Sequence, residues 1–171
     1  MEYPSFETQR LLLRPTQVED AVFILELFNS PNWIEFIGDR NVHTSADART
    51  YIEDRMIPQL KRLGYSTYTI RRKSDGSKMG TIGLYDREGL DGIDLGFALL
   101  PEYENQGYAF EASEKLVVAA AETFGLSALK AITTIDNLGS QKLLRKLGFQ
   151  ESGNIQIAGS DKSFMLYGLD L

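Results

Sequence analysis

The spacing of hydrophobic and polar residues near the start of the chain predicts a strand followed by a helix. Residues 8–14, Thr-Gln-Arg-Leu-Leu-Leu-Arg, have the composition of a strand that Pro15 ends. Thr16 and Glu19 have the spacing of a capping box, so a helix is expected to begin there and to stop at Asn29-Ser-Pro31. The apolar side of this helix consists of Val22, Phe23, Leu25, Leu27 and Phe28.

A second, longer helix is expected from Ser45 to Leu63. Its apolar residues recur at helical spacing and are Ala48, Tyr51, Ile52, Met56, Leu60 and Leu63. Pro58 lies inside this pattern and is expected to kink or split the helix, because proline has no N–H to donate. Gly64 marks the end of the helix.

The rest of the chain predicts strands first and strand–helix units later. Strands are expected at residues 65–71, 79–85, 93–100, 129–135, 149–157 and 162–169, and helices from about 109 to 124 and from 138 to 147. The first two of these strands flank a hairpin turn, Ser74-Asp-Gly-Ser77. The order predicts a single α/β domain over residues 1–171, with a mixed sheet of about seven strands and helices on both faces.

The composition is that of an ordinary globular protein. The chain has 171 residues, 43% hydrophobic and 25% charged, which suffices for one core. No apolar run approaches the roughly 20 residues that span a bilayer, so no membrane partner is expected. The acidic start lacks the pattern of a secretory signal, and a cytoplasmic protein is expected. Because there is no cysteine, disulfides, thiol nucleophiles and thiolate metal sites are excluded, and no metal is expected.

The net charge of −6 disfavours nucleic acid as a partner, because neutralising phosphates requires clustered Lys and Arg. The same charge favours a cationic partner such as an amine or a basic peptide. The alternative interpretation is that it serves only solubility.

The segment Gln106-Gly-Tyr-Ala-Phe-Glu111 lies between a predicted strand and a predicted helix. Gly107 and the small Ala109 allow a ligand to approach the backbone. The first N–H groups of a helix have no partner within it and can hold a phosphate, helped by the helix dipole. The segment therefore has the form of a pyrophosphate cradle, although a glycine before a helix can also be a simple turn.

A second segment begins with Asn137-Leu-Gly-Ser140 and ends with Leu-Gly-Phe149. It predicts the end of a strand, a short helix and the opening of the next strand. Asn137 can be either a ligand-binding residue or only the N-cap of that helix. Gly148 is explained by the helix end alone.

Together these segments resemble the GNAT superfamily of acyl-CoA N-acyltransferases. The resemblance is to the branch that acetylates the N-terminal alanine or serine of ribosomal proteins. It spans most of the chain and rests on residues 8–15, 94–103, 106–109 with Glu111-Ala112, 137–140 and 144–149. It implies a GNAT-like twisted sheet whose central strands splay apart.

The resemblance also implies acetyl-CoA as the cosubstrate and a set of residues that hold it. The pyrophosphate would lie on the backbone N–H groups of Gln106, Gly107, Tyr108, Ala109 and Phe110. The pantetheine arm would pair with exposed backbone at Phe97, Ala98 and Leu99, and Asn137 would contact the arm from the end of the next strand. A backbone N–H of the strand at 93–100 would polarise the acetyl carbonyl.

Two positions depart from the family pattern. The first position of the pyrophosphate loop, usually Arg or Gln or, in this branch, Trp, holds Glu104 here. The position of the family's tyrosine general acid holds Leu144, and the resemblance implies Ser140 in that role. Asp94 matches the branch's carboxylate and would act as general base through water, its alternative being a solvated strand residue. The alternative for Ser140 is helix capping.

The resemblance places the amine acceptor beside Trp33, Phe36 and Tyr51, which can equally be core residues or a dimer face. The acceptor is expected to be a protein N-terminus or a small molecule, and the chain a monomer or homodimer. His43, the only histidine, is expected to be exposed. A non-catalytic acyl-CoA-binding regulator is the competing function.

Overall fold

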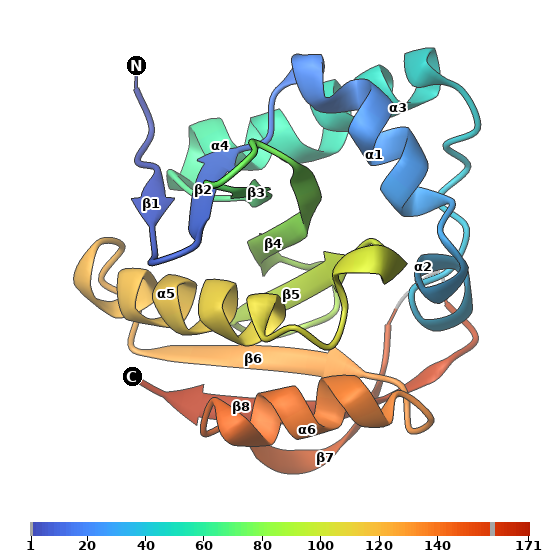
Figure 1. Cartoon of the computed structure of the whole chain (residues 1–171). Helices are drawn as coiled ribbons and strands as arrows, with labels where there is room; N and C mark the ends of the chain where they lie inside the picture. The colour runs from blue at the N-terminus through green and yellow to red at the C-terminus, as the bar shows by residue number, and fades with distance from the viewer. Residues whose placement is uncertain (1, 158–159) are drawn as a thin grey trace.

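A twisted sheet of eight strands forms the centre of the computed structural model, which describes residues 2–157 and 160–171 (Figure 1). In chain order the strands are β1 (Phe6–Glu7), β2 (Leu11–Pro15), β3 (Thr67–Arg72), β4 (Lys78–Asp86), β5 (Ile93–Leu99), β6 (Ala128–Thr133), β7 (Gln150–Gln156) and β8 (Ser163–Asp170). Their order across the sheet is β1-β2-β3-β4-β5-β6-β8-β7. All neighbours are antiparallel except β5 and β6. The expected mixed, mostly antiparallel sheet is confirmed, with β1 as an additional strand.

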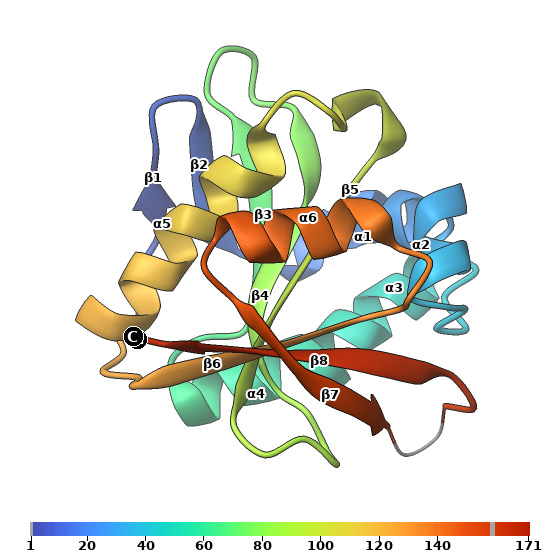
Figure 2. The ribbon, with the colours of Figure 1, turned by 90° about the horizontal axis from the view of Figure 1, so that it is seen from below.

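Helices cover both faces of the sheet (Figure 2). In chain order they are α1 (Ala21–Phe28), α2 (Pro31–Phe36), α3 (Ser45–Tyr51), α4 (Ile57–Leu63), α5 (Tyr108–Glu122) and α6 (Leu138–Lys146). Helices α5 and α6 bury apolar side chains such as Leu116 and Leu144 in the larger core, together with Ile82 and Leu95 of the sheet. A second apolar cluster holds α1 and α3 against the opposite face. Among the described residues, no helix combines the length and apolarity that a bilayer crossing requires.

The start of the chain is a hairpin and not the single strand expected at residues 8–14. The N–H of Thr8 donates to the carbonyl of Leu11 over 3.0 Å, and the N–H of Leu11 donates to the Thr8 hydroxyl, also over 3.0 Å. β1 and β2 flank this turn. The turn is fixed from outside by Glu111 of α5, which accepts hydrogen bonds from Thr8 and Arg10. Because Glu111 lies about 100 residues away in sequence, the local pattern of residues 8–14 could not predict this turn.

The capping box expected at Thr16 and Glu19 is wrong by one residue. The carboxylate of Asp20 accepts from the N–H of Gln17 over 2.9 Å, and a 3-10 turn (Val18–Asp20) leads into α1. Thr16 is buried, and its hydroxyl is 2.9 Å from that of Thr69 on β3. Thr16 therefore ties the chain to the sheet, and its hydroxyl is not available as a helix cap.

Two prolines shape the helices after α1. α1 ends where expected, but Pro31 also begins α2, because the missing N–H costs nothing at the first position of a helix. The sequence analysis missed this short helix. The helix expected at 45–63 is split into α3 and α4 by a π-helical segment, Ile52–Met56, just before Pro58. Wider π turns place the proline without the clash it would cause inside a regular α-helix.

Tyr85 of β4 lies across glycines on the face of the sheet toward α1 and α3. A Cβ atom added at Gly83 would lie 2.4 Å from Cζ of Tyr85, and one added at Gly96 would lie 2.9 Å from its Cε2. In the β4–β5 ladder Tyr85 pairs with Asp94, and the two glycines pair with each other. Because side chains at paired positions share a face, Tyr85 and Asp94 lie on the same side of the sheet.

The parallel strands β5 and β6 pair at a single position, Asp94 with Lys130. Beyond that position the two strands separate (Figure 1). β5 then leads into the loop before α5, and β6 leads into the turn before α6. The expected splay of the central strands is confirmed. It opens the middle of the sheet at the carboxyl ends of its two parallel strands.

Gly83→Ala tests the close packing of Tyr85. We expect the free energy of unfolding to fall by about 1–3 kcal/mol, because the added methyl group meets the Tyr85 ring and the carbonyl of Ser66. Urea denaturation measures the change. Gly139→Ala is the control, since its Cβ would have no neighbour closer than 4.0 Å and its stability should not fall. Equal stability of Gly83→Ala and the unchanged protein would contradict this packing.

Candidate active site

The loop before α5 presents a row of backbone N–H groups at the open end of the β5–β6 gap. Gly107 is the N-cap residue of α5 and has φ of 83°, a left-handed conformation that glycine adopts without strain. No side chain caps the helix. The N–H groups at the start of a 15-residue helix therefore remain available to an anion, and the helix dipole favours one there. Tyr108 is buried, so it can contribute only its backbone to this cradle.

Arg10 holds the cradle loop from the β1–β2 turn, and the sequence analysis did not single it out. Its Nε donates to Glu111 over 2.8 Å and its Nη1 donates to the carbonyl of Gln106 over 3.1 Å. Its guanidinium also lies over the Tyr108 ring, 4.3 Å from the centroid. Burial alone would raise the pKa of Glu111, but the hydrogen bonds that its carboxylate accepts from Thr8 and Arg10, together with the charge of Arg10, lower it. The arginine thus fixes the loop and brings positive charge to it.

The edge of β5 that faces the gap carries backbone groups without strand partners. The N–H of Leu100 donates to the carbonyl of Met79 beside β4. Because the hydrogen-bonding groups of a strand alternate in direction, those of Leu99 and Phe97 point away from β4 and toward the gap. β6 pairs with β5 only at Asp94, so it does not cover them. The side chain of Ala98 faces the cluster around α1. An extended polar ligand could add to this edge as a strand does.

The other side of the gap is formed by the turn from β6 into α6. Asn137 is the N-cap of α6, and its Oδ1 accepts from the N–H of Ser140 over 3.2 Å. The capping interpretation of Asn137 is thus correct, and its amide nitrogen can still donate to a ligand. Gln141 fixes the turn by donating to the carbonyls of Thr134 and Ile135. The cap is Asn137 and not Ser140, whose side chain is half-buried at the first turn of α6.

Two further groups at this turn went unnoticed in the sequence. The hydroxyls of Thr133 and Thr134 are buried and have no hydrogen-bond partner within the described part of the chain. They lie where β6 ends. Buried polar groups without partners are costly, so a ligand that formed hydrogen bonds with these hydroxyls would be stabilised.

Asp94 lies at the closed end of the gap, apart from the cradle. Its carboxylate is 1% exposed, with Oδ2 3.4 Å from Nη2 of Arg87. Oδ1 has no hydrogen-bond partner in the described residues. Burial raises the pKa of Asp94, and the Arg87 guanidinium opposes that rise. At about 3.3 Å per residue, Phe97 lies roughly 10 Å further along β5, so a chain of water molecules would have to link Asp94 to chemistry there. The expected alternative of a solvated residue is wrong.

Glu104, the acidic residue that departs from the family pattern, is tied to α2. Its carboxylate accepts a short hydrogen bond from the side-chain amide of Asn32. α2 is held at its other end by Lys162, whose ammonium donates to the carbonyl of Glu35 over 2.9 Å. The interaction with Asn32 gives Glu104 a partner outside the cradle.

The aromatic residues expected to line the acceptor side form one stack. Trp33 of α2 stacks on Phe28 with ring centroids 4.1 Å apart, and Tyr51 of α3 meets Phe28 edge-on at 5.0 Å. Phe36 is half-buried on α2. The side chain of His43 is 57% exposed, which confirms the expectation that it lies at the surface. In the described residues, no cluster of three or more His, Cys, Asp or Glu has the arrangement of a metal site.

The sequence matches a family profile described as "Acetyltransferase (GNAT) domain" over residues 10–150. The chain belongs to the GNAT acetyltransferase family. Membership makes it an N-acetyltransferase, an enzyme class that uses acetyl-CoA, and favours a catalyst over the competing regulator. The family resemblance seen in the sequence is confirmed.

Named relatives of this chain agree with the family assignment. "Uncharacterized N-acetyltransferase YoaA" of Bacillus subtilis (strain 168) is 29% identical over 152 residues, which are 88% of this chain and 85% of that protein. A ribosomal-protein-S5-alanine acetyltransferase from Vibrio fischeri has 19% identity and a TM-score of 0.80, covering 98% of this chain and 96% of that one. RimL, a ribosomal L7/L12 alpha-N-protein acetyltransferase in complex with coenzyme A, has 16% identity and a TM-score of 0.79, covering 98% of both chains. At such identities the two structures show the fold alone.

Asn32→Ala tests whether the hydrogen bond to Glu104 keeps its charge from the cradle. We expect the Kd for CoA to rise roughly three- to tenfold, because the released carboxylate would repel an anion at the cradle by about 1 kcal/mol. Calorimetry at low and high salt measures it, and the effect should shrink with salt.

The double variant Asn32→Ala/Glu104→Gln is the matched control, and it should restore the Kd because the charge is gone. Glu104→Gln alone should bind CoA no more weakly than the unchanged protein. If the double variant binds as poorly as Asn32→Ala, the effect comes from a displaced α2 and not from charge.

Proposed function

We propose that this protein transfers the acetyl group of acetyl-CoA to a primary amine by direct attack on the thioester. The observation that carries the proposal is the gap between β5 and β6, which ends at an uncapped helix N-terminus. A gap edged by unpaired strand backbone suits the amide-containing pantetheine arm. The helix N-terminus suits the pyrophosphate at the other end of the same molecule.

The cofactor would be held mainly by backbone groups. The pyrophosphate binds the N–H groups of residues 106–110, beside the charges of Arg10 and of Lys146, whose ammonium lies 4.0 Å from the centroid of the Phe110 ring. The arm pairs with the edge of β5 at residues 97–99, and Asn137 donates from the opposite side of the gap. Because backbone groups would bind the cofactor, the side chains of the loop can vary. This agrees with the presence of Glu104 where the family usually has Arg, Gln or Trp.

The chemistry needs a neutral amine, a polarised carbonyl and a proton for the leaving thiolate. An N–H on the gap-facing edge of β5 would stabilise the oxyanion. As the C–N bond forms and the C–S bond breaks, the amine gives its proton through water to Asp94. The CoA thiolate takes a proton from the Ser140 hydroxyl, which recovers one from solvent. Positioning of the two substrates side by side supplies much of the rate.

The acceptor is either a protein N-terminal α-amine or a small-molecule amine. Support for the protein N-terminus comes from fold neighbours named as ribosomal-protein acetyltransferases. The aromatic stack of Phe28, Trp33 and Tyr51 offers an apolar wall to either kind of acceptor.

Acetyl-CoA binding together with thiol release over a set of amines tests the proposed function. We expect the protein to bind acetyl-CoA and to release free CoA only when an acceptor is present. Asp94→Asn and Ser140→Ala should each lower kcat roughly 10- to 100-fold, as expected for loss of general base or general acid catalysis. Calorimetry gives binding, and a thiol reagent gives turnover. No affinity for CoA or acetyl-CoA at millimolar concentration would refute the proposal, and binding without thiol release would support a regulator.

Arg87→Gln tests Asp94 as the base through the pH profile of kcat/KM. Burial raises the pKa of Asp94 and the guanidinium lowers it, so removal of the guanidinium should raise it further. Because the base must be deprotonated, the rising acid limb of the profile should move to higher pH. Arg62→Gln, which removes the partner of exposed Asp86, is the control and should leave the limb in place. An unmoved limb in Arg87→Gln would exclude Asp94 as the base.

A further inference from the structure

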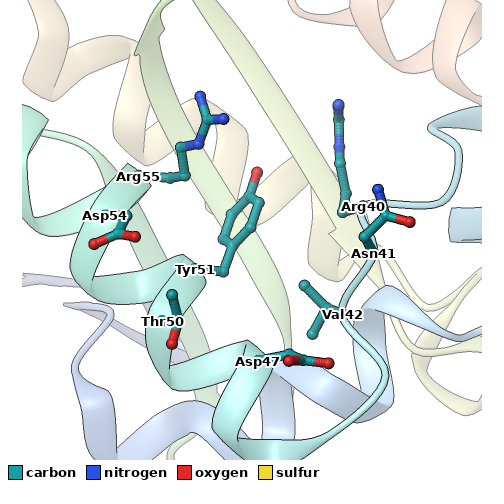
Figure 3. A pocket seen from close by; sticks show the side chains of 8 residues that line it. All are labelled: Arg40, Asn41, Val42, Asp47, Thr50, Tyr51, Asp54 and Arg55. Carbon is teal, nitrogen blue, oxygen red and sulfur yellow. The ribbon is translucent and has the colours of Figure 1, made fainter.

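A pocket of about 220 Å³ lies between the π-helical segment and the loop that joins α2 to α3 (Figure 3). Its lining is mostly polar, with Arg40 and Asn41 from the loop and Tyr51 and Arg55 from the helix. Figure 3 shows the Tyr51 ring standing between the two arginines, with its hydroxyl and both guanidinium groups pointing the same way. Three groups that can donate hydrogen bonds thus line one pocket and point the same way.

Both arginines are free to bind a ligand. Arg40 and Arg55 form no ion pair and no side-chain hydrogen bond with any other residue in the described parts of the chain. Arg49, on the same helical stretch, shows the ordinary alternative, because its Nε lies 3.1 Å from Glu53. Both guanidinium groups line the same pocket, so an anion bound there would be attracted by both.

Two carboxylates, Asp47 and Asp54, also line the pocket, and among the residues that the structure describes neither forms an ion pair with Arg40 or Arg55. Asp47 accepts hydrogen bonds from the backbone N–H groups of His43 and Thr44 at the start of α3. These hydrogen bonds lower the pKa of Asp47, so it stays ionised in its capping role. Asp54 is exposed and points away from the guanidinium groups in Figure 3. The carboxylates thus leave both guanidinium groups available, although the pocket lining as a whole holds two acidic and two basic side chains.

Tyr51 connects this pocket to the face of the sheet that carries Asp94. Its ring packs edge-on against Phe28, within the apolar cluster that covers this face. Ala98 of β5 packs against the same cluster, and Asp94, four residues before it on the strand, lies on the same face of the sheet. Tyr85 pairs with Asp94 in the ladder. The pocket and the candidate base thus belong to one continuous side of the molecule.

We propose that Arg40 and Arg55 bind a carboxylate of the acceptor, so that the enzyme selects amines that also carry a carboxylate. The inference rests on the proposed function, because it assumes that an amine is acetylated beside Asp94. Arginine's planar fork matches a carboxylate in two parallel hydrogen bonds, and the Tyr51 hydroxyl can add a third donor. The carboxylate can come from a free amino acid or from an acidic side chain near a protein N-terminus, and the volume of the pocket suits such a small group.

Acetylation of matched acceptors tests this selection. Free amino acids are compared with their methyl esters, and N-terminal peptides with Glu at the second or third position with the same peptides carrying Gln. We expect the KM of the preferred carboxylate-bearing acceptor to rise about tenfold or more in Arg40→Ala and in Arg55→Ala, through loss of a charged hydrogen bond. The KM for acetyl-CoA and the rate with the ester or Gln acceptors should not change.

Arg49→Ala is the matched control, since it removes a cation from the same helical stretch but outside the pocket. It should leave every acceptor's KM unchanged. The amino-acid and peptide arms tell a small-molecule acceptor from a protein N-terminus. Equal KM values for charged and neutral acceptors overturn the inference, and so does a protein that binds acetyl-CoA but acetylates no carboxylate-bearing amine. Neither result affects the cofactor assignment, which fails only if acetyl-CoA does not bind.

Discussion

The separation of β5 from β6 after one paired residue is the constraint on which the rest of the active side depends. Parallel strands in the middle of a sheet normally satisfy each other's backbone groups, and an unpaired edge at that place is costly. Here the strands stay together at Asp94 and Lys130 and then part, so the ends of two parallel strands and the starts of two helices surround an opening in the sheet. In the proposed binding mode, a ligand that supplies amide groups to this edge would restore the missing hydrogen bonds, and its charged end would lie at the start of α5.

An opening of this kind persists only if both of its sides are fixed from outside. On the β5 side, Glu111 and Arg10 bind the cradle loop to the N-terminal hairpin, and Arg10 also reaches the Gln106 carbonyl. On the β6 side, Asn137 and Gln141 fix the turn into α6 through backbone contacts. The two apolar cores hold the helices on opposite faces of the sheet. The gap is therefore a built feature of the fold, stabilised by contacts that do not cross it.

The elements that the sequence predicted well are those whose signals are local. Helix α5, expected from about residue 109, and the hairpin strands β3 and β4 follow from spacing and turn chemistry alone. The elements that it missed depend on distant partners: the turn at residues 8–10 is set by Glu111, and the cap expected at Thr16 is lost because its hydroxyl is bound to Thr69. The sequence pattern did not predict α2, because Pro31 was interpreted as the end of α1 and it is also the first residue of α2. For the site, the cradle and Asn137 were readable as motifs, but Arg10, Asn32 and the unpaired hydroxyls of Thr133 and Thr134 acquire their roles only from the packing.

The placement of charge shows why net charge is a poor guide to the ligands of this protein. The net charge of −6 produces a negative electrostatic field around the protein, and at long range this field attracts cations. Within one Debye length, about 8–10 Å at ordinary ionic strength, the charges of nearby side chains determine which ligand binds. Glu104, the acidic residue nearest the cradle in sequence, is hydrogen-bonded to Asn32. The carboxylate of Asp47 accepts hydrogen bonds from the backbone at the start of α3. The cations Arg10, Arg40 and Arg55 lie at the two places where the proposed ligands are anionic. An acceptor with both an amine and a carboxylate suits this arrangement better than a simple cation, because the acidic surface can attract its ammonium while the arginine pair binds its carboxylate.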